Sequence, residues 1–119
     1  MKKLLIVMFA LIVFVAGCDN TTFTGSKTGN DEQFLVDFDV LNTTVDSKMQ
    51  LTKGDKIKTD IDIKKGDVDI RVKNEKGKTA YQGNDVASCS FIFEIEETGT
   101  YTFYIKGSKA KGKVYFTKQ

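Results

Sequence analysis

Alternation of apolar and polar residues is the feature that most constrains how this chain can fold. From Phe34 onward, apolar side chains recur at every second position, which is the spacing of a strand with one buried face, and no convincing helical stripe appears. The apolar positions group into eight short runs, at residues 34–40, 45–51, 57–63, 68–72, 79–81, 89–95, 101–105 and 114–116. Short strands at this regular spacing predict an all-β fold: a single antiparallel β-sandwich, with a small barrel as the alternative.

The N-terminal residues follow a different pattern. Lys2 and Lys3 precede an unbroken apolar run at residues 4–16, and Gly17 and Cys18 follow it. A short basic flank before a short apolar run is typical of an export signal. Thirteen apolar residues are fewer than the roughly 20 that a membrane-spanning helix needs. We therefore predict a signal helix at residues 1–17 that is removed, rather than a permanent membrane span.

The end of this run, Val15-Ala16-Gly17-Cys18, resembles the lipobox of bacterial lipoproteins. The resemblance implies cleavage before Cys18, attachment of lipid to its sulfur and anchoring on the extracytoplasmic side of a membrane. Two or three acyl chains hold a protein firmly where a single chain would not. An ordinary secretory signal cleaved nearby, with Cys18 incidental, is the alternative. The sequence leaves open whether that side is a Gram-negative periplasm or a Gram-positive surface.

Removal of residues 1–17 leaves 102 of the 119 residues, enough for one domain with a modest core. Residues 18–33 are polar, with Phe23 the only large apolar side chain, and we predict a lipid-bearing flexible tether there. Residues 34–119 would then form the sandwich domain.

The turns within residues 52–116 resemble those of GOLD-type and related jelly-roll sandwich modules of secreted proteins. The resemblance is carried by the segments Lys53-Gly54-Asp55, 66–72, 74–78 and 99–103. It implies a binding or adaptor function rather than catalysis.

Composition excludes several chemistries. The chain contains no histidine, which removes Ser-His, Cys-His and His-zinc sites, and we expect neither an enzyme nor a cofactor. Without Lys2 and Lys3 the mature chain has 16 basic and 16 acidic residues, a balance that disfavours nucleic acid as a partner. Cys89 shares strand parity with Phe91 and Phe93, which favours a small buried side chain over a reactive thiol.

A hairpin turning at residues 65–66 would pair Asp62 with Asp69 on its outer face. Two carboxylates directly opposite each other are unfavourable unless a cation intervenes. Calcium would suit oxygen ligands but usually takes six to eight of them, and Lys64 and Arg71 can neutralise the pair unaided. We therefore expect no metal here.

A second hairpin, turning at residues 108–111, gives the candidate binding surface. It would place Tyr104 opposite Tyr115 and Lys106 opposite Lys113, and pairing of 89–95 with 101–105 would bring Ile92 beside Tyr104. Exposed aromatic rings beside cations could receive a sugar ring, a peptide strand or an anionic polymer. The alternative is cross-strand tyrosine packing with lysines that discourage aggregation.

These observations predict a membrane-anchored lipoprotein with a non-catalytic binding or adaptor module. Its partners would be the membrane, through lipid on Cys18, and an envelope protein, a peptide or an anionic glycan. A structural or inhibitory lipoprotein acting through a sheet edge is the alternative. The lysines that follow Glu97 make one end of the chain basic and could orient the domain toward anionic lipid or wall polymer.

Overall fold

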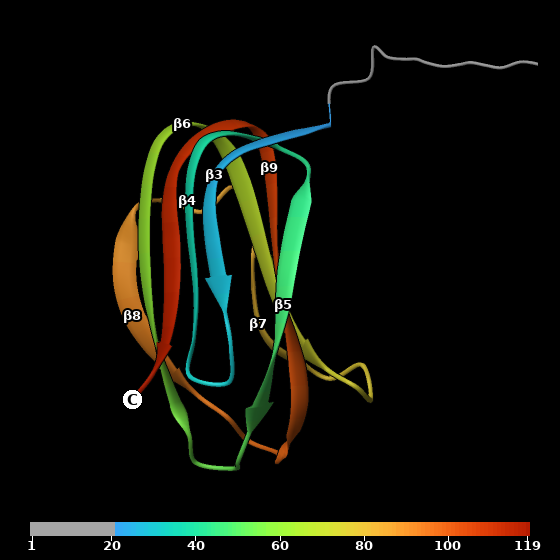
Figure 1. Ribbon diagram of the computed structural model, residues 1–119. Coiled ribbons are helices and arrows are strands. Elements are labelled where there is room, and N and C mark those ends of the chain that lie inside the picture. The colour runs from blue at the N-terminus through green and yellow to red at the C-terminus, as the bar shows by residue number, and fades with distance from the viewer. Residues whose placement is uncertain (1–20) are drawn as a thin grey trace, which may run out of the picture.

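The computed structural model describes residues 21–119, which form seven antiparallel strands and no helix (Figure 1). The predicted all-β sandwich is confirmed, whereas the predicted signal helix and Cys18 lie outside the described residues. The strands are β3 (Thr22–Gly29), β4 (Gln33–Asn42), β5 (Thr44–Leu51), β6 (Lys56–Asn74), β7 (Thr79–Gly83), β8 (Cys89–Glu94) and β9 (Gly99–Lys118).

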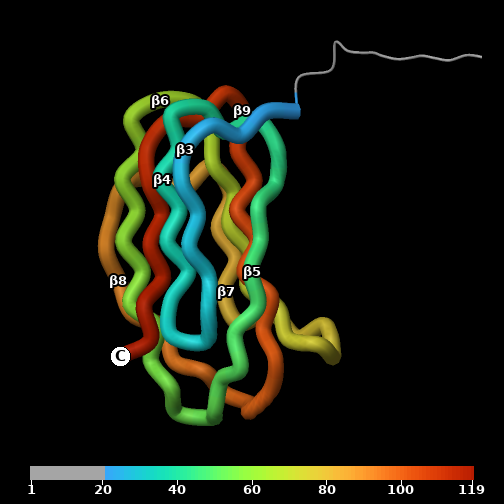
Figure 2. The backbone as a smooth tube through the Cα atoms, viewed as in Figure 1, coloured from blue at the N-terminus to red at the C-terminus, as the bar shows by residue number. Residues whose placement is uncertain are grey.

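The long strands β6 and β9 organise the fold. They pair antiparallel along almost their whole length, from Ile57 with Lys118 to Asn74 with Tyr101. Phe103 and Phe116 are 13 residues apart on β9, which would separate them by about 40 Å in a straight strand. Their ring centroids are nevertheless 4.9 Å apart. Both long strands therefore fold over midway, as Figure 2 shows, and turn one sheet into two packed layers.

Each layer contains one half of each long strand. The first layer has the order β3, β4, C-terminal half of β9, N-terminal half of β6, β8. The second has the order β5, N-terminal half of β9, C-terminal half of β6, β7. Inward residues of both layers, among them Phe34, Ile70 and Phe103, form a single buried core. The Tyr101 hydroxyl donates to the Glu97 carbonyl at 2.6 Å, which forms a tyrosine corner at the start of β9.

The bend depends on a close approach between the two long strands. Gly66 has φ +78°, a conformation that favours glycine, and a Cβ there would lie 2.6 Å from the Cα of Ala110. The ladder shifts register on both sides of Lys65. A side chain at Gly66 would therefore push the two strands apart where they change layers.

The expected hairpins at residues 65–66 and 108–111 are wrong. Asp62 lies opposite Lys113 in the first layer, and Asp69 lies opposite Lys106 in the second, so the two aspartates do not face each other. Pairing the long strands with each other satisfies their backbone groups and buries the same alternate residues as the hairpins would. Alternation therefore could not distinguish between the two arrangements.

The expected flexible tether over residues 18–33 also needs correction, because β3 occupies most of it. Thr22–Gly29 pairs with β4, from Thr22 with Asn42 to Gly29 with Phe34. Only Phe23 from this strand packs against the core, so backbone pairing holds β3 with little apolar burial. A strand that buries so little has the polar composition of a flexible tether, so the sequence pattern did not distinguish the two.

Two further residues differ from expectation. Cys89 is exposed, at the first position of the edge strand β8, and not buried. Val40 is 42% exposed, because a register shift between Phe38 and Leu41 breaks the alternation and turns Leu41 inward in its place.

Candidate functional site

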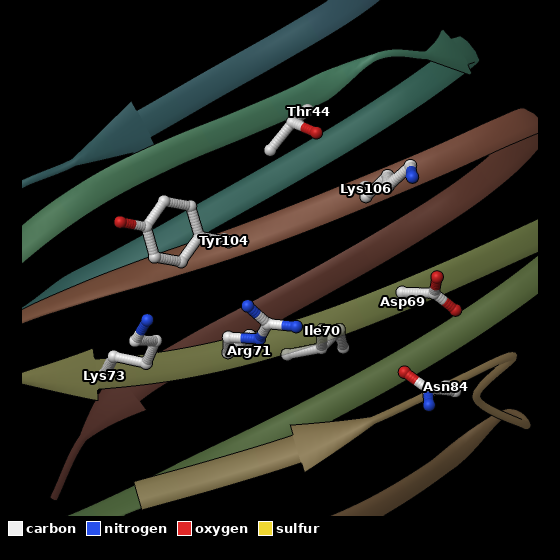
Figure 3. Close-up of a pocket in the computed structure, with 8 residues that line it drawn as sticks. All are labelled: Thr44, Asp69, Ile70, Arg71, Lys73, Asn84, Tyr104 and Lys106. Carbon is white, nitrogen blue, oxygen red and sulfur yellow. The ribbon is translucent and has the colours of Figure 1, made fainter. Parts of the chain in front are cut away.

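A groove with a volume of about 380 Å³ lies on the outer surface of the second layer (Figure 3). Strands β5, β9 and β6 supply most of its lining, and the segment after β7 closes one end. The residues that line it are Thr44, Asp69, Ile70, Arg71, Lys73, Asn84, Tyr104 and Lys106.

Strand alternation places these polar side chains on the outer surface. Tyr104 and Lys106 alternate on β9 with the buried residues Phe103 and Ile105. Arg71 pairs directly with Tyr104 across the β6–β9 ladder. Figure 3 shows Arg71 in the middle of the group, with Tyr104 and Lys73 to one side and Asp69 and Asn84 to the other.

The cations of the groove have no anionic partner within residues 21–119. Arg71, Lys73 and Lys106 form no ion pair there, whereas Lys56, Lys64, Lys78 and Lys118 each do. Asp69 faces Lys106 across the ladder, but its carboxylate accepts the backbone amide of Asp85 at 2.7 Å. The groove therefore presents three unpaired positive charges around a tyrosine ring.

One end of the groove is acidic. The hydrogen bond with Asp67 and the negative charges of Asp67 and Asp69 raise the pKa of Asp85 above its ordinary value. An anionic ligand would consequently be drawn toward Arg71 and Lys73, away from Asp69.

The five residues predicted to form one surface lie on two. Tyr104 and Lys106 line the groove in the second layer. Tyr115 and Lys113 lie on the outer side of the first layer, and Ile92 lies there too, on β8, with β6 between it and β9. The prediction that Ile92 lies beside Tyr104 is wrong. Ile92 pairs with Lys58, and Tyr104 pairs with Arg71 and Asp46.

Tyr115 is engaged in contacts within the domain. Its hydroxyl donates to Asp37 at 2.8 Å, and Lys113 Nζ lies 5.2 Å from the centre of its ring. The hydrogen bond to Asp37 raises the pKa of Tyr115. These contacts fit the alternative of structural tyrosine packing, whereas the Tyr104 hydroxyl has no hydrogen-bond partner within residues 21–119.

Sequence reasoning missed Arg71 and Lys73 as partners of Tyr104. Both alternate with the buried Ile70 and Val72, so their outward direction was evident. Their proximity to Tyr104 follows only from the pairing of β6 with β9, which the local pattern does not reveal.

Within residues 21–119, no group of three or more histidine, cysteine, aspartate or glutamate side chains is placed to hold a metal ion. The same residues contain no helix long and apolar enough to cross a membrane.

No protein-family profile matches this sequence, and no curated protein matches it. The solved structures that are similar in fold include two all-β domains. One is PliG of Aeromonas hydrophila, a periplasmic inhibitor of g-type lysozyme, with 9% identity, a TM-score of 0.53 and coverage of 80% of this chain and 88% of that one. The other is the pre-peptidase C-terminal domain of a collagenase from Bacillus anthracis, with 12% identity, a TM-score of 0.55 and coverage of 85% and 100%. At these identities the likeness establishes an all-β domain of the same general architecture and nothing further.

Proposed function

We propose that this chain is a lipid-anchored extracytoplasmic binding module without catalytic activity, whose groove takes an anionic ligand of the cell envelope. The export signal and the lipobox-like Val15-Ala16-Gly17-Cys18 support the anchor and the location. The absence of histidine from the whole sequence supports a binding role over catalysis.

The observation that carries the choice of ligand is the set of unpaired cations around Tyr104. Arg71 offers a planar fork of donors that matches a carboxylate or phosphate group, and Lys73 and Lys106 add positive charge on either side of the tyrosine. The exposed ring of Tyr104 offers an apolar surface with a polar tip, which suits a sugar or polyol backbone between anionic groups. An anionic glycan or polyol phosphate chain has both features.

The test measures binding of the full mature chain to two anionic probes, poly(glycerol phosphate) and polygalacturonate, with neutral dextran as the uncharged comparison. Isothermal titration should detect the anionic probes, with affinity that falls as salt is added. Replacing Arg71 and Lys73 together (R71S/K73S) should weaken binding by about a hundredfold, since each lost charge-assisted contact is worth about 1.5 kcal/mol or more.

The matched control is K58S/K113S, which removes the same charge from the outer surface of the first layer. It should leave the affinity unchanged. Equal weakening by both double variants would show that net charge alone drives binding, and equal affinity for dextran would show that the ligand is not selected by its charge. Either result would contradict the proposed site.

A second candidate, action through a sheet edge on an envelope protein, is favoured by the edge strands. Each of β3, β5, β7 and β8 pairs along one side only within the described part of the chain. A similar fold occurs in PliG, which inhibits a g-type lysozyme. Inhibition of g-type lysozyme by the purified chain, unaffected by R71S/K73S, would favour this candidate over the groove.

A further inference from the structure

The described chain begins at one end of the sandwich, where the long strands bend. Thr22 lies there beside Lys65, Lys109 and Val40, around a shallow depression of about 370 Å³. Figure 1 shows the first described residues emerging at the end where β6 and β9 fold over. We call Val40, Lys65, Lys109 and Lys111 the basic tip.

The three lysines of the basic tip extend into solvent. Lys65 pairs with Lys111 across the bend, where the two strands turn, and both are exposed. Lys109 is exposed and has φ +50°, a left-handed conformation held in place because its backbone amide donates to the Asn42 side chain at 2.9 Å. Within residues 21–119 none of the three forms an ion pair.

Acidic groups at this end balance the three lysine charges only in part. Asp39 is the one carboxylate among the residues that line the depression. Asp67, opposite Ser108, hydrogen-bonds to Asp85, which follows β7. Lys65 and Lys109 lie beside the start of β3, and Lys111 lines a neighbouring groove that also contains Asp37, Asp39 and Asp62. Beside Thr22 the two lysines outnumber Asp39, so the charge is positive on the side from which the chain leads to Cys18.

An anchor at Cys18 would bring the basic tip close to the bilayer. Three residues lie between Cys18 and Thr22, and the four backbone steps that join these two residues span at most about 14 Å when fully extended. This connection is much shorter than a tether ending at residue 33, because β3 uses most of that segment. The range of electrostatic attraction at physiological salt is about 8 Å, so side chains at this end of the domain would lie within or near it.

We propose that the basic tip docks on anionic lipid headgroups and fixes the orientation of the domain on its membrane, an inference that rests on the proposed lipid anchor. Each lysine near an anionic surface adds to the electrostatic attraction between the domain and the membrane. Val40, exposed by the bulge in β4, adds an apolar contact among the lysines at the headgroup boundary. The groove lies on the outer surface of the second layer, so docking by the tip would leave it open to the envelope.

The absence of tryptophan from the sequence gives a direct test. The lipidated chain with V40W would be reconstituted in phosphatidylcholine vesicles, with or without phosphatidylglycerol, and its fluorescence quenched by brominated lipid. Quenching should be stronger by roughly twofold or more with phosphatidylglycerol. I92W is the matched control, since Ile92 is 54% exposed on β8, away from the tip, and should not respond.

Charge is tested separately, in the V40W background. The triple change K65Q/K109Q/K111Q should remove the dependence on phosphatidylglycerol, whereas K48Q/K58Q/K76Q, which removes equal charge elsewhere, should not. Equal quenching in both kinds of vesicle, or equal loss in both triple variants, would overturn the docking surface while leaving the anchor standing. An intact mass of the mature chain that shows no lipid on Cys18 would instead overturn the anchor, and this orientation with it.

Discussion

Thr59 is a polar residue within the hydrophobic core. It is fully buried between inward neighbours on β6, and its hydroxyl oxygen has no hydrogen-bond partner within residues 21–119. A buried hydroxyl without a partner loses its hydration and gains nothing in return.

Replacing Thr59 with valine (T59V) should therefore stabilise the domain. Valine keeps the shape of the side chain and removes the unsatisfied hydroxyl, so the free energy of unfolding should rise by about 1 kcal/mol in urea titrations. T59A, which leaves a cavity as well, is the comparison and should be less stable than T59V. A T59V domain that unfolds at lower urea than the wild type would mean that the hydroxyl has a partner in solution.

Asp85 should make stability depend on pH. Its pKa is raised in the folded protein above the ordinary 3.8, chiefly by the hydrogen bond with Asp67. The folded state then binds this proton more tightly than the unfolded state, so the associated stability is present below pH 3.8 and is lost as pH rises through the folded pKa.

The variant D85N removes that charge, and asparagine tolerates the φ of +48° found at this position. Its melting temperature should exceed that of the wild type near neutral pH, and the difference should shrink in acid. Circular dichroism melts at both pH values give the comparison. A constant difference, or none at neutral pH, would contradict the effect of Asp67 on Asp85.

At this scale the sequence predicted the direction of side chains well. Alternation alone places Phe103 and Ile105 inside and Tyr104 and Lys106 outside, as the structure confirms. It failed at Val40, where a bulge shifts the pattern by one residue. A bulge depends on the partner strand, so one strand's own sequence does not predict it.

At the scale of elements, the bend shared by β6 and β9 determines the architecture. Gly66, at the bend, and Gly54, away from it, both have positive φ, so a side chain added at each position separates the effect of the bend from that of backbone conformation. At Gly66 an added Cβ would collide with the backbone of Lys109 and Ala110, whereas at Gly54, with φ +95°, nothing lies within 4 Å.

G54A should lower the free energy of unfolding by about 1–2 kcal/mol, the penalty for placing a side chain in left-handed backbone. G66A should lower the free energy of unfolding by that amount and by about a further 1–3 kcal/mol, because the long strands must move apart. Urea titrations of both variants provide the measurement. Equal destabilisation would show that the close approach at the bend does not contribute.

Pairing partners were the part of the fold that sequence reasoning could not supply. The residues from 57 to 72 bury the same side chains whether they form a local hairpin or one long strand against β9. The choice is made by contacts far apart in sequence, such as Ile57 with Lys118. For the same reason β3 escaped notice, since it is held by the backbone of β4 and not by its own apolar residues.

At the scale of the whole molecule, the two layers present different outer surfaces. On the first, Tyr115, Asp37 and Lys113 satisfy one another. On the second, Tyr104 and the cations of the groove have no such partners within the described residues. The sequence predicted aromatic residues beside lysines, but it merged two surfaces that the fold separates. We infer that the second surface carries the function.

The most direct test of that claim is a two-dimensional amide NMR titration of the full mature chain with poly(glycerol phosphate). We expect the shifts to concentrate on the outward residues of β9, β6 and β5, with Tyr104, Arg71 and Lys73 among the largest. Shifts gathered around Tyr115 and Ile92, or along an edge strand such as β8, would contradict the account, as would a titration that leaves every amide unmoved.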